Sequence, residues 1–315
     1  MSTRWLGVAA PATSANVGPG FDTAALALGL HLHVDAQEAG EFSIQAEGRN
    51  ADVCGALGGN LIVEVYREVM ERAGMPVIPL HLQLRNEIPL GMGCGSSAAA
   101  RVAGVTLAVY FGRLGWGRKR IFEEAARLEG HPDNAAACVL GGFVVSGARD
   151  GAGEGGSPIA VTMTPPGTWS AVLAIPARPL ATSASRAVLP DSYGRRAAVS
   201  NVQCVALLTA GFSRGDEELV RAGMHDWLHQ PYRSDVCPLL PALIGLRTED
   251  GVLGVALSGA GPSVMVLCRS DAAAGVSEKV RAATGSLTAS DATEVLICGL
   301  DSRGLQASGD GMPLW

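Results

Sequence analysis

Charged side chains are scarce in this sequence: they make up 17% of its 315 residues, where about 25% is usual in soluble proteins. The 24 basic residues are outnumbered by 30 acidic ones, so the formal net charge is −6. No basic run is longer than Arg118, Lys119 and Arg120. A surface that neutralises nucleic-acid phosphates needs a clustered basic excess. We therefore expect no nucleic-acid partner.

Long continuous apolar runs are missing as well. The uncharged stretch at residues 251–268 is interrupted by a glycine-containing turn at 258–263, so it predicts strand, turn and strand rather than a membrane span of about 20 apolar residues. The apolar start of the chain covers only residues 5–10, which is shorter than the roughly seven residues that a secretion signal needs. These absences predict no membrane partner.

Cysteine is present, but without a metal-binding or disulfide pattern. The seven cysteines are odd in number and widely spaced, and they form no C-x-x-C pair and no Cys/His pairs at zinc spacing. This usage is typical of reduced thiols in the core of a cytosolic protein. We expect a cytoplasmic protein without a structural metal.

Glycine is abundant by contrast, since 41 glycines are about 13% of the chain where about 7% is usual. Hydrophobic residues make up 48%, which excludes a disordered or collagen-like chain. The composition indicates a globular protein of about two domains whose backbone can bend sharply or approach a ligand closely.

Hydrophobic periodicity predicts helices and strands in mixed order. Helices are expected at residues 61–73, 96–110, 119–128 and 272–283, and two more around 199–208 and 219–228. Strands are expected at residues 4–10, 31–37, 41–47, 80–85, 142–146, 159–163, 170–175, 252–257 and 293–298. Because the two types do not alternate steadily, the sequence predicts an α+β fold.

The stretch GARDGAGEGGSP at residues 147–158 is polar, glycine-rich and without hydrophobic periodicity. These properties are typical of a linker. We therefore expect an N-terminal domain at residues 1–156 and a C-terminal domain at residues 157–315. The glycine-containing tail beyond the last expected strand is interpreted as mobile.

The densest motif is a glycine-rich loop between an expected strand and an expected helix. It comprises Pro89, Leu90, Gly91, Met92, Gly93, Cys94, Gly95, Ser96, Ser97, Ala98 and Ala99. Glycines at alternate positions leave backbone N–H groups unobstructed, and the helix N-terminus adds partial positive charge, so the loop suits a phosphate. Neither ordinary nucleotide-binding pattern matches, and a structural turn with Ser96 as helix cap is the alternative.

This loop resembles the second motif of the GHMP kinases, a superfamily of small-molecule kinases. Further segments match in order: PATSANVGPGFD at 11–22, EGHPDNAAACVLGG at 129–142, residues 224–233, and GVALSGAGPSVMVL at 254–267. The segments at 129–142 and 224–233 are most similar to the bacterial homoserine kinases. The resemblance implies a two-domain GHMP kinase fold, with an N-terminal domain like the second domain of ribosomal protein S5 and a ferredoxin-like C-terminal domain.

The sequence departs from the family pattern at two places. Cys94 stands where leucine is usual, and Thr23, Ala24 and Ala25 replace the usual Ser-Leu-Gly after Phe21 and Asp22. The second departure follows the expected acceptor site, so it affects the choice of substrate more than phosphoryl transfer.

ATP and Mg²⁺ are the cofactors that the resemblance implies. Ser97, at the expected helix start, can ligate Mg²⁺ through its hydroxyl, and the resemblance implies a glutamate before His131 as its partner. We favour Glu129, with Glu123 as the alternative. A solvated charge at a helix end is the other interpretation of either glutamate. Gly259 and Gly261, in the last matching motif, are expected to pack against the phosphate loop.

An amino-acid acceptor needs a cation for its carboxylate and an anion for its ammonium. Arginine binds carboxylate through a planar fork, so Arg186 and Arg233 are the candidates, with Thr182 in the same family-like segment as Arg186. Asp22 is the candidate for the ammonium group, and Asn16 for orienting the hydroxyl. A surface ion pair or a turn is the alternative role for these residues.

His131, Asp133 and Asn134 form a polar cluster before the expected strand at 142–146. Histidine beside aspartate is common in helix capping, and the resemblance implies substrate positioning by His131 and Asn134. Whether Asp133 accepts a proton stays open. We expect His225, Asp226 and His229, which have helical spacing, to form hydrogen bonds between elements rather than a metal site.

Taken together, the resemblance implies an ATP-dependent homoserine kinase that makes O-phospho-L-homoserine for threonine biosynthesis, as a homodimer with Asn16, His131, Asn134 and Arg186 as its catalytic residues. Two alternatives remain: a kinase for another small hydroxylated metabolite, and a non-catalytic nucleotide-binding regulator with the same fold.

Overall fold

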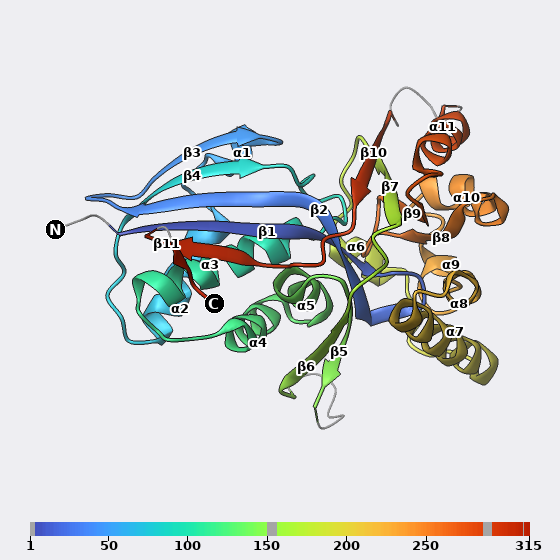
Figure 1. Cartoon of the computed structure of the whole chain (residues 1–315), viewed down its shortest axis with the longest axis horizontal. Helices are drawn as coiled ribbons and strands as arrows, with labels where there is room; N and C mark the ends of the chain where they lie inside the picture. The colour runs from blue at the N-terminus through green and yellow to red at the C-terminus, as the bar shows by residue number, and fades with distance from the viewer. Residues whose placement is uncertain (1–3, 150–155, 286–291, 311) are drawn as a thin grey trace.

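Two sheets organise the chain, and each lies beside its own helices (Figure 1). The computed structural model describes residues 4–149, 156–285, 292–310 and 312–315. The main path of the first sheet contains, in spatial order, β12 (Met312–Pro313), β11 (Gln306–Gly309), β1 (Trp5–Asn16), β2 (Gly20–Glu38), β4 (Leu80–Asn86) and β3 (Ser43–Gly48). β3 pairs with β4 in parallel, and the other neighbours on this path are antiparallel.

One face of the first sheet is apolar and the other is polar. Along β2, Leu32, Val34 and Ala36 are buried, whereas the alternate residues His31, His33 and Asp35 reach the surface. An antiparallel sheet that packs on one face and meets water on the other has this alternation. The helices of this half that bury apolar side chains therefore lie against a single face, and they gather on one side of the sheet in Figure 1.

Three helices of the first half lie where the sequence predicts them. The first-half helices are α1 (Ala51–Cys54), α2 (Leu61–Arg72), α3 (Ser96–Phe111), α4 (Arg118–Glu129) and α5 (Asp133–Leu140). The expectations for α2, α3 and α4 are confirmed. The Asn60 side chain accepts hydrogen bonds from the backbone N–H groups of Ile62 and Val63, at 3.1 and 3.4 Å, which caps α2.

The second sheet is four-stranded and antiparallel. Its spatial order is β10 (Thr293–Gly299), β7 (Trp169–Pro176), β9 (Val264–Arg269) and β8 (Val252–Leu257). The helical segments of this half are α6 (Thr182–Ala187), α7 (Arg195–Arg214), α8 (Glu217–Gly223), α9 (Gln230–Arg233), α10 (Leu239–Leu243), η1 (Ile244–Thr248) and α11 (Ala273–Thr284). The helix expected around 219–228 is α8, which ends earlier, at Gly223; residues 224–229 are not helical.

The glycine-rich stretch at 147–158 joins two strands of the same sheet. β5 (Phe143–Ala148) pairs with β2 and with β6 (Pro158–Met163), and the hairpin projects from the first sheet in Figure 1. Residues 150–155 lie outside the described residues. The chain passes to the second sheet only after β6, so strand pairing favours a division within residues 164–168 over the expected one at 156.

The end of the chain returns to the first sheet, whereas the sequence indicates a mobile tail. β11 pairs with β1 over four residue pairs, from Leu6 with Gly309 to Ala9 with Gln306, and it runs beside β1 in Figure 1. The first sheet is thus completed by both ends of the chain. Within the described residues, no helix combines the length and the apolar character needed to cross a membrane.

Candidate active site

A cavity of about 130 Å³ lies where the two halves of the chain meet. Its lining comes from the β1–β2 turn, the glycine-rich loop, the start of α5, α6, α9 and the β8–β9 turn. The sequence-predicted site residues that line it are Asn16, Asp22, Gly91, Gly93, Gly95, Ser96, Ser97, Glu129, His131, Asn134, Thr182, Arg186, Arg233, Gly259 and Gly261. Segments far apart in the sequence therefore contribute to one concave site.

Six residues of the glycine-rich motif do not line this cavity. Cys94, Ala98 and Ala99 are buried, and burial raises the pKa of the Cys94 thiol to about 11. Pro89, Leu90 and Met92 line a second cavity on the other side of the loop. The motif thus divides into residues that shape the loop and residues that face one or the other cavity.

Close packing explains the glycines of the loop. Gly93 has φ 76° and Gly95 has φ 69°, a region that residues with a side chain avoid. A Cβ on Gly95 would lie 1.9 Å from Thr13 Oγ1, and one on Gly93 would lie 2.2 Å from the carbonyl oxygen of Ser258. Only glycine fits either position, so the loop can approach β1 and the β8–β9 turn.

The β8–β9 turn packs against the glycine-rich loop, as the last motif led us to expect. The Ser258 hydroxyl donates to the Gly93 carbonyl at 2.7 Å. Gly259 N–H donates to the Ala15 carbonyl at 3.1 Å, and the Asn16 amide donates to the Gly259 carbonyl at 2.8 Å. Three motifs are therefore held together, and Asn16 also accepts from the Asp22 N–H at 3.1 Å.

Ser97 and Glu129 lie together, as expected for the predicted metal-ligand pair. The Ser97 Oγ lies 3.4 Å from Glu129 Oε2, whereas Glu123 pairs with Lys119 and Arg120 and does not line the cavity. Oxygen donors suit Mg²⁺, whose neighbouring ligands in an octahedron are about 3 Å apart. The donor set therefore fits a magnesium ion.

Arg101 already places a cation at this pair. It lies one helical turn after Ser97, and its guanidinium contacts the Ser97 hydroxyl and lies 2.5 Å from Glu129 Oε2. The Arg101 and Glu129 side chains are only 21% and 11% exposed, so this ion pair is little screened by solvent. The guanidinium shows that the pair of oxygens attracts positive charge.

Asp22 and Arg186 face each other at the same cavity. Arg186 Nη2 donates to Asp22 Oδ1 at 2.7 Å, and the guanidinium lies 5.5 Å from the centre of the Phe21 ring. Both side chains are more than one third exposed, so their mutual attraction is modest. The pair can therefore open for a ligand that carries both charges.

Arg233 is the buried cation of the site. It is 1% exposed, its Nε donates to the Ser185 carbonyl at 3.1 Å, and its Nη1 lies 3.0 Å from His229 Nδ1. His229 Nε2 lies 2.7 Å from the Gly18 carbonyl, so the ring donates there and accepts from Arg233. Burial lowers the pKa of His229, which keeps it neutral. The expectation of hydrogen bonding between elements is confirmed at His229.

His131 and Asn134 are oriented by neighbours. His131 Nδ1 lies 2.6 Å from Asp133 Oδ1. Burial acts to lower the pKa of His131, but the hydrogen bond and charge of Asp133, with the charges of Glu129 and Asp22, raise it above 6.5. The Thr13 hydroxyl donates to Asn134 Oδ1 at 2.6 Å, which turns the amide N–H₂ away from Thr13. Asp133 also accepts from the Asn134 N–H at 2.7 Å.

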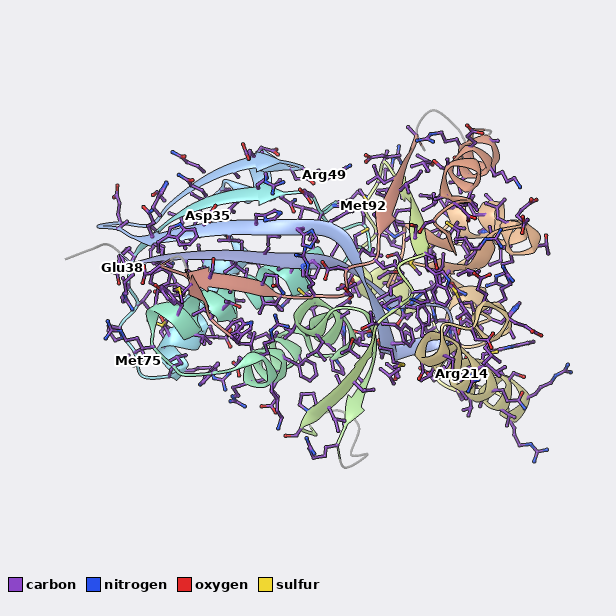
Figure 2. The ribbon with its side chains drawn as sticks, viewed as in Figure 1. Asp35, Glu38, Arg49, Met75, Met92 and Arg214 are labelled. Carbon is purple, nitrogen blue, oxygen red and sulfur yellow. The ribbon has the colours of Figure 1, made fainter. Side chains whose placement is uncertain are left out.

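The second cavity, of about 510 Å³, adjoins the outer side of the loop. It is lined by Arg49, Asn50, Pro89, Leu90, Met92, Ile175, Pro176, Ala177, Ala292, Thr293 and Glu294. Figure 2 shows Arg49 and Met92 at the end of the first sheet that faces the second half. The guanidinium of Arg49 binds both carboxylate oxygens of Glu294, at 2.8 and 2.5 Å, and so bridges the halves.

Sequence reasoning missed Thr13, Ser185 and Arg101 near the site. Thr13 lies in a fully buried stretch of β1, where nothing distinguishes it from its neighbours. Ser185 donates to the Ala260 carbonyl at 2.6 Å, a contact that only tertiary structure creates. Arg101 could have been predicted from the sequence, because residues at i and i+4 share one face of a helix and Ser97 was already a candidate.

The fold and the site define a class of small-molecule kinase. Family models match as the GHMP kinases N terminal domain over residues 60–142 and as GHMP kinases C terminal over residues 208–286. The N-terminal match contains the glycine-rich loop and the Glu129–Asn134 segment, so the family features and the cavity coincide.

Individual relatives narrow this class. A homoserine kinase of Solibacter usitatus is 42% identical over 97% of this chain and 98% of its own length, and one from Moorella thermoacetica is 40% identical over 83% and 87%. The crystal structure of homoserine kinase from Cytophaga hutchinsonii superposes with TM-score 0.82 at 25% identity, covering 96% of this chain and 97% of that one. The chain belongs to the homoserine kinase family of GHMP kinases.

Proposed function

We propose that this protein is an ATP-dependent homoserine kinase, which transfers the γ-phosphoryl group of ATP to the side-chain hydroxyl of L-homoserine. The product is O-phospho-L-homoserine, a step in threonine biosynthesis. The observation that carries the proposal is one cavity that joins an anion-binding loop to a pair of arginines and a carboxylate. A small zwitterionic alcohol matches that combination of charges.

The nucleotide end of the site is built mainly from backbone. N–H groups of the glycine-rich loop and the N-terminus of α3 bind phosphate, and the second cavity beyond Pro89 and Leu90 has room for the base and ribose. Ser97 and Glu129 would hold Mg²⁺, which when bound neutralises phosphate charge. The Arg101 guanidinium, which contacts both side chains, competes with the ion for them.

The acceptor end uses side chains. Arg233 and Arg186 bind the α-carboxylate, with Thr182 beside them, and Asp22 binds the α-ammonium. Asn16, His131 and Asn134 orient the side-chain hydroxyl toward the phosphate loop. The contacts of Asp133 to His131 and to the Asn134 N–H support an orienting role for that carboxylate. Positioning and charge neutralisation are the main demands of phosphoryl transfer.

The departure at residues 23–25 does not alter the acceptor pocket directly. Ala24 and Ala25 are 2% and 0% exposed and pair with Val145 and Val144 of β5. The Thr23 carbonyl accepts from the Ser146 hydroxyl at 3.0 Å. None of the three residues lines the cavity, so this departure gives no reason to prefer another alcohol.

The experiment is ADP release in the presence of Mg²⁺ and L-homoserine, with homoserine-free and mevalonate reactions as controls. We expect homoserine-dependent turnover and formation of O-phospho-L-homoserine. Turnover with a different alcohol in a substrate panel would favour the alternative kinase, and ATP binding without any acceptor-dependent ADP release would favour the regulator.

Arg233→Lys separates acceptor binding from the rest of the reaction. Lysine keeps the charge but lacks the planar fork, so the KM for homoserine should rise more than that for ATP. Arg178→Lys, at an exposed position that does not line the cavity, is the matched control and should change neither constant.

Dimerisation and a cytoplasmic location belong to the same proposal. They rest on the family resemblance and on the reduced cysteines, since all seven thiols are free in this structure. Light scattering of the purified protein should give twice the 32.3 kDa chain mass. Cell fractionation should recover the protein with the cytoplasm.

A further inference from the structure

We infer that the open face of the first sheet carries a binding site for a borderline divalent cation such as Zn²⁺, with His31, His33 and Glu87 as ligands. This site is separate from the Ser97–Glu129 pair and does not depend on the proposed kinase activity. Within the described residues, these three form the group of metal-ligating side chains whose ligand atoms all lie within 4.8 Å of one another.

Strand geometry brings the three side chains together. His31 and His33 are two residues apart on β2, so both point to the polar face, and their ring centres are 5.7 Å apart. Glu87 follows β4 and contacts the backbone of His31: the Glu87 N–H donates to the His31 carbonyl at 3.0 Å, and the His31 N–H donates to Glu87 Oε2 at 3.0 Å. The backbone therefore fixes the spacing of the ligands.

A carboxylate outside the cluster orients His31. Its Nε2 lies 3.0 Å from Asp301 Oδ2, while Asp301 Oδ1 accepts the backbone N–H groups of Arg303 and Gly304 at 2.8 and 2.7 Å. Because Nε2 is directed at Asp301, Nδ1 is the ring nitrogen of His31 left to coordinate a metal. Metal-binding histidines commonly have such a carboxylate behind them.

The donor types also suit a metal. Two imidazoles and a carboxylate are a donor set that suits Zn²⁺ and related cations.

To bind a metal, the ligand atoms must move closer together. Ligand atoms around tetrahedral Zn²⁺ are about 3.3 Å apart, given bonds of about 2.0–2.1 Å, whereas those of the cluster lie within 4.8 Å of one another and His33 Nε2 lies 4.0 Å from Glu87 Oε1. Rotation of partly exposed side chains can supply that difference. Arg85 is the competitor, because its guanidinium pairs with Glu87 and lies on the same face.

The test is Co²⁺ titration of metal-stripped protein, followed by visible absorption and competed with Zn²⁺. We expect bands of low-symmetry Co²⁺ without thiolate charge-transfer absorption, and their loss in the His31→Ala/His33→Ala double variant. His81→Ala is the matched control: this histidine is also on the polar face, but its Nδ1 lies 2.8 Å from Ser43 Oγ and it is not in the cluster.

Two further variants separate a built site from incidental binding. Asp301→Asn should weaken Co²⁺ binding about 10- to 100-fold, as loss of an orienting carboxylate does, and Arg85→Met should tighten it. Zn²⁺ should raise the Tm of the wild type and not of the double histidine variant. Equal Co²⁺ binding in wild type and double variant, thiolate bands, or no binding at all would overturn the proposal.

Discussion

Single residues in the site are controlled by partners in the surrounding protein. His131 is the clearest case, because the hydrogen bond and negative charge of Asp133 outweigh the burial that would otherwise lower its pKa. A raised pKa keeps the ring partly cationic near neutral pH, which favours contact with an anionic phosphate. Asp133 therefore affects the site through His131.

Asp133→Asn tests this coupling. Asparagine keeps a hydrogen-bond acceptor but removes the charge, so the NMR titration midpoint of the His131 ring should fall. In the wild type, the His131–Asp133 pair stabilises the folded state fully below pH 6.5, the ordinary pKa of histidine. This stabilisation is lost as the pH rises through the higher pKa that His131 has in the folded protein. The variant should lose that pH dependence. An unchanged midpoint would contradict the coupling.

Arg101 makes a second prediction at the residue scale. Replacing it with methionine keeps much of the apolar stem but removes the cation at the Ser97–Glu129 pair. Like charges about 4 Å apart repel by about 1 kcal/mol even in bulk water, so Mn²⁺, used as a paramagnetic probe of the proposed magnesium site, should bind at least about fivefold more tightly in Arg101→Met.

The matched control for Arg101→Met is Arg214→Met. Arg214 ends α7 in the second half of the chain and does not line the cavity. This control should leave the Mn²⁺ affinity unchanged. Equal or weaker Mn²⁺ binding in Arg101→Met would mean that the guanidinium supports the site instead of competing with the cation.

At the scale of elements, the glycine-rich loop depends on the turn that packs against it. Gly93→Ala adds a methyl group 2.2 Å from the Ser258 carbonyl and forces alanine to φ 76°. The backbone strain alone costs about 1–3 kcal/mol. We expect a lower free energy of unfolding in denaturant titration and weaker ATP binding by calorimetry.

Gly117→Ala is the control for this loop variant. Gly117 precedes α4 with φ −84°, and a Cβ there meets nothing within 4 Å. Its stability and ATP affinity should match the wild type. If Gly93→Ala behaved like this control, the loop and the turn would not be coupled as their contacts indicate.

Elements were predictable from sequence where one face is apolar and the other polar. α2 has that pattern and its expected range is confirmed. α5 was missed because residues 135–139 are uniformly small or apolar and buried, which leaves no period to detect. The glycine-rich loop was predictable because its pattern is local, whereas Thr13 and Ser185 contribute through contacts between distant segments that no local pattern encodes.

At the scale of the whole molecule, the sequence did not reveal that the end of the chain completes the first sheet. β11 is QASG, which lacks the β-branched residues typical of a strand. Contacts with other elements hold this segment in place: Leu305 is fully buried, and the Arg118 guanidinium donates to the Leu305 carbonyl at 2.7 Å. The segment before it also carries Asp301, which orients His31.

Truncation after Arg303 tests whether this return stabilises the first half. The shortened chain loses the buried Leu305 side chain, worth about 2 kcal/mol of apolar burial, and the β11–β1 pairing, so β1 becomes an edge strand. We expect a lower Tm and faster hydrogen exchange at the amides of residues 6–9, which pair with β11. Removal of Trp315 alone, which is 39% exposed, should change neither quantity. Unaltered exchange at residues 6–9 in the longer truncation would mean that β11 adds no protection to the sheet, and the tail would then be dispensable for the fold.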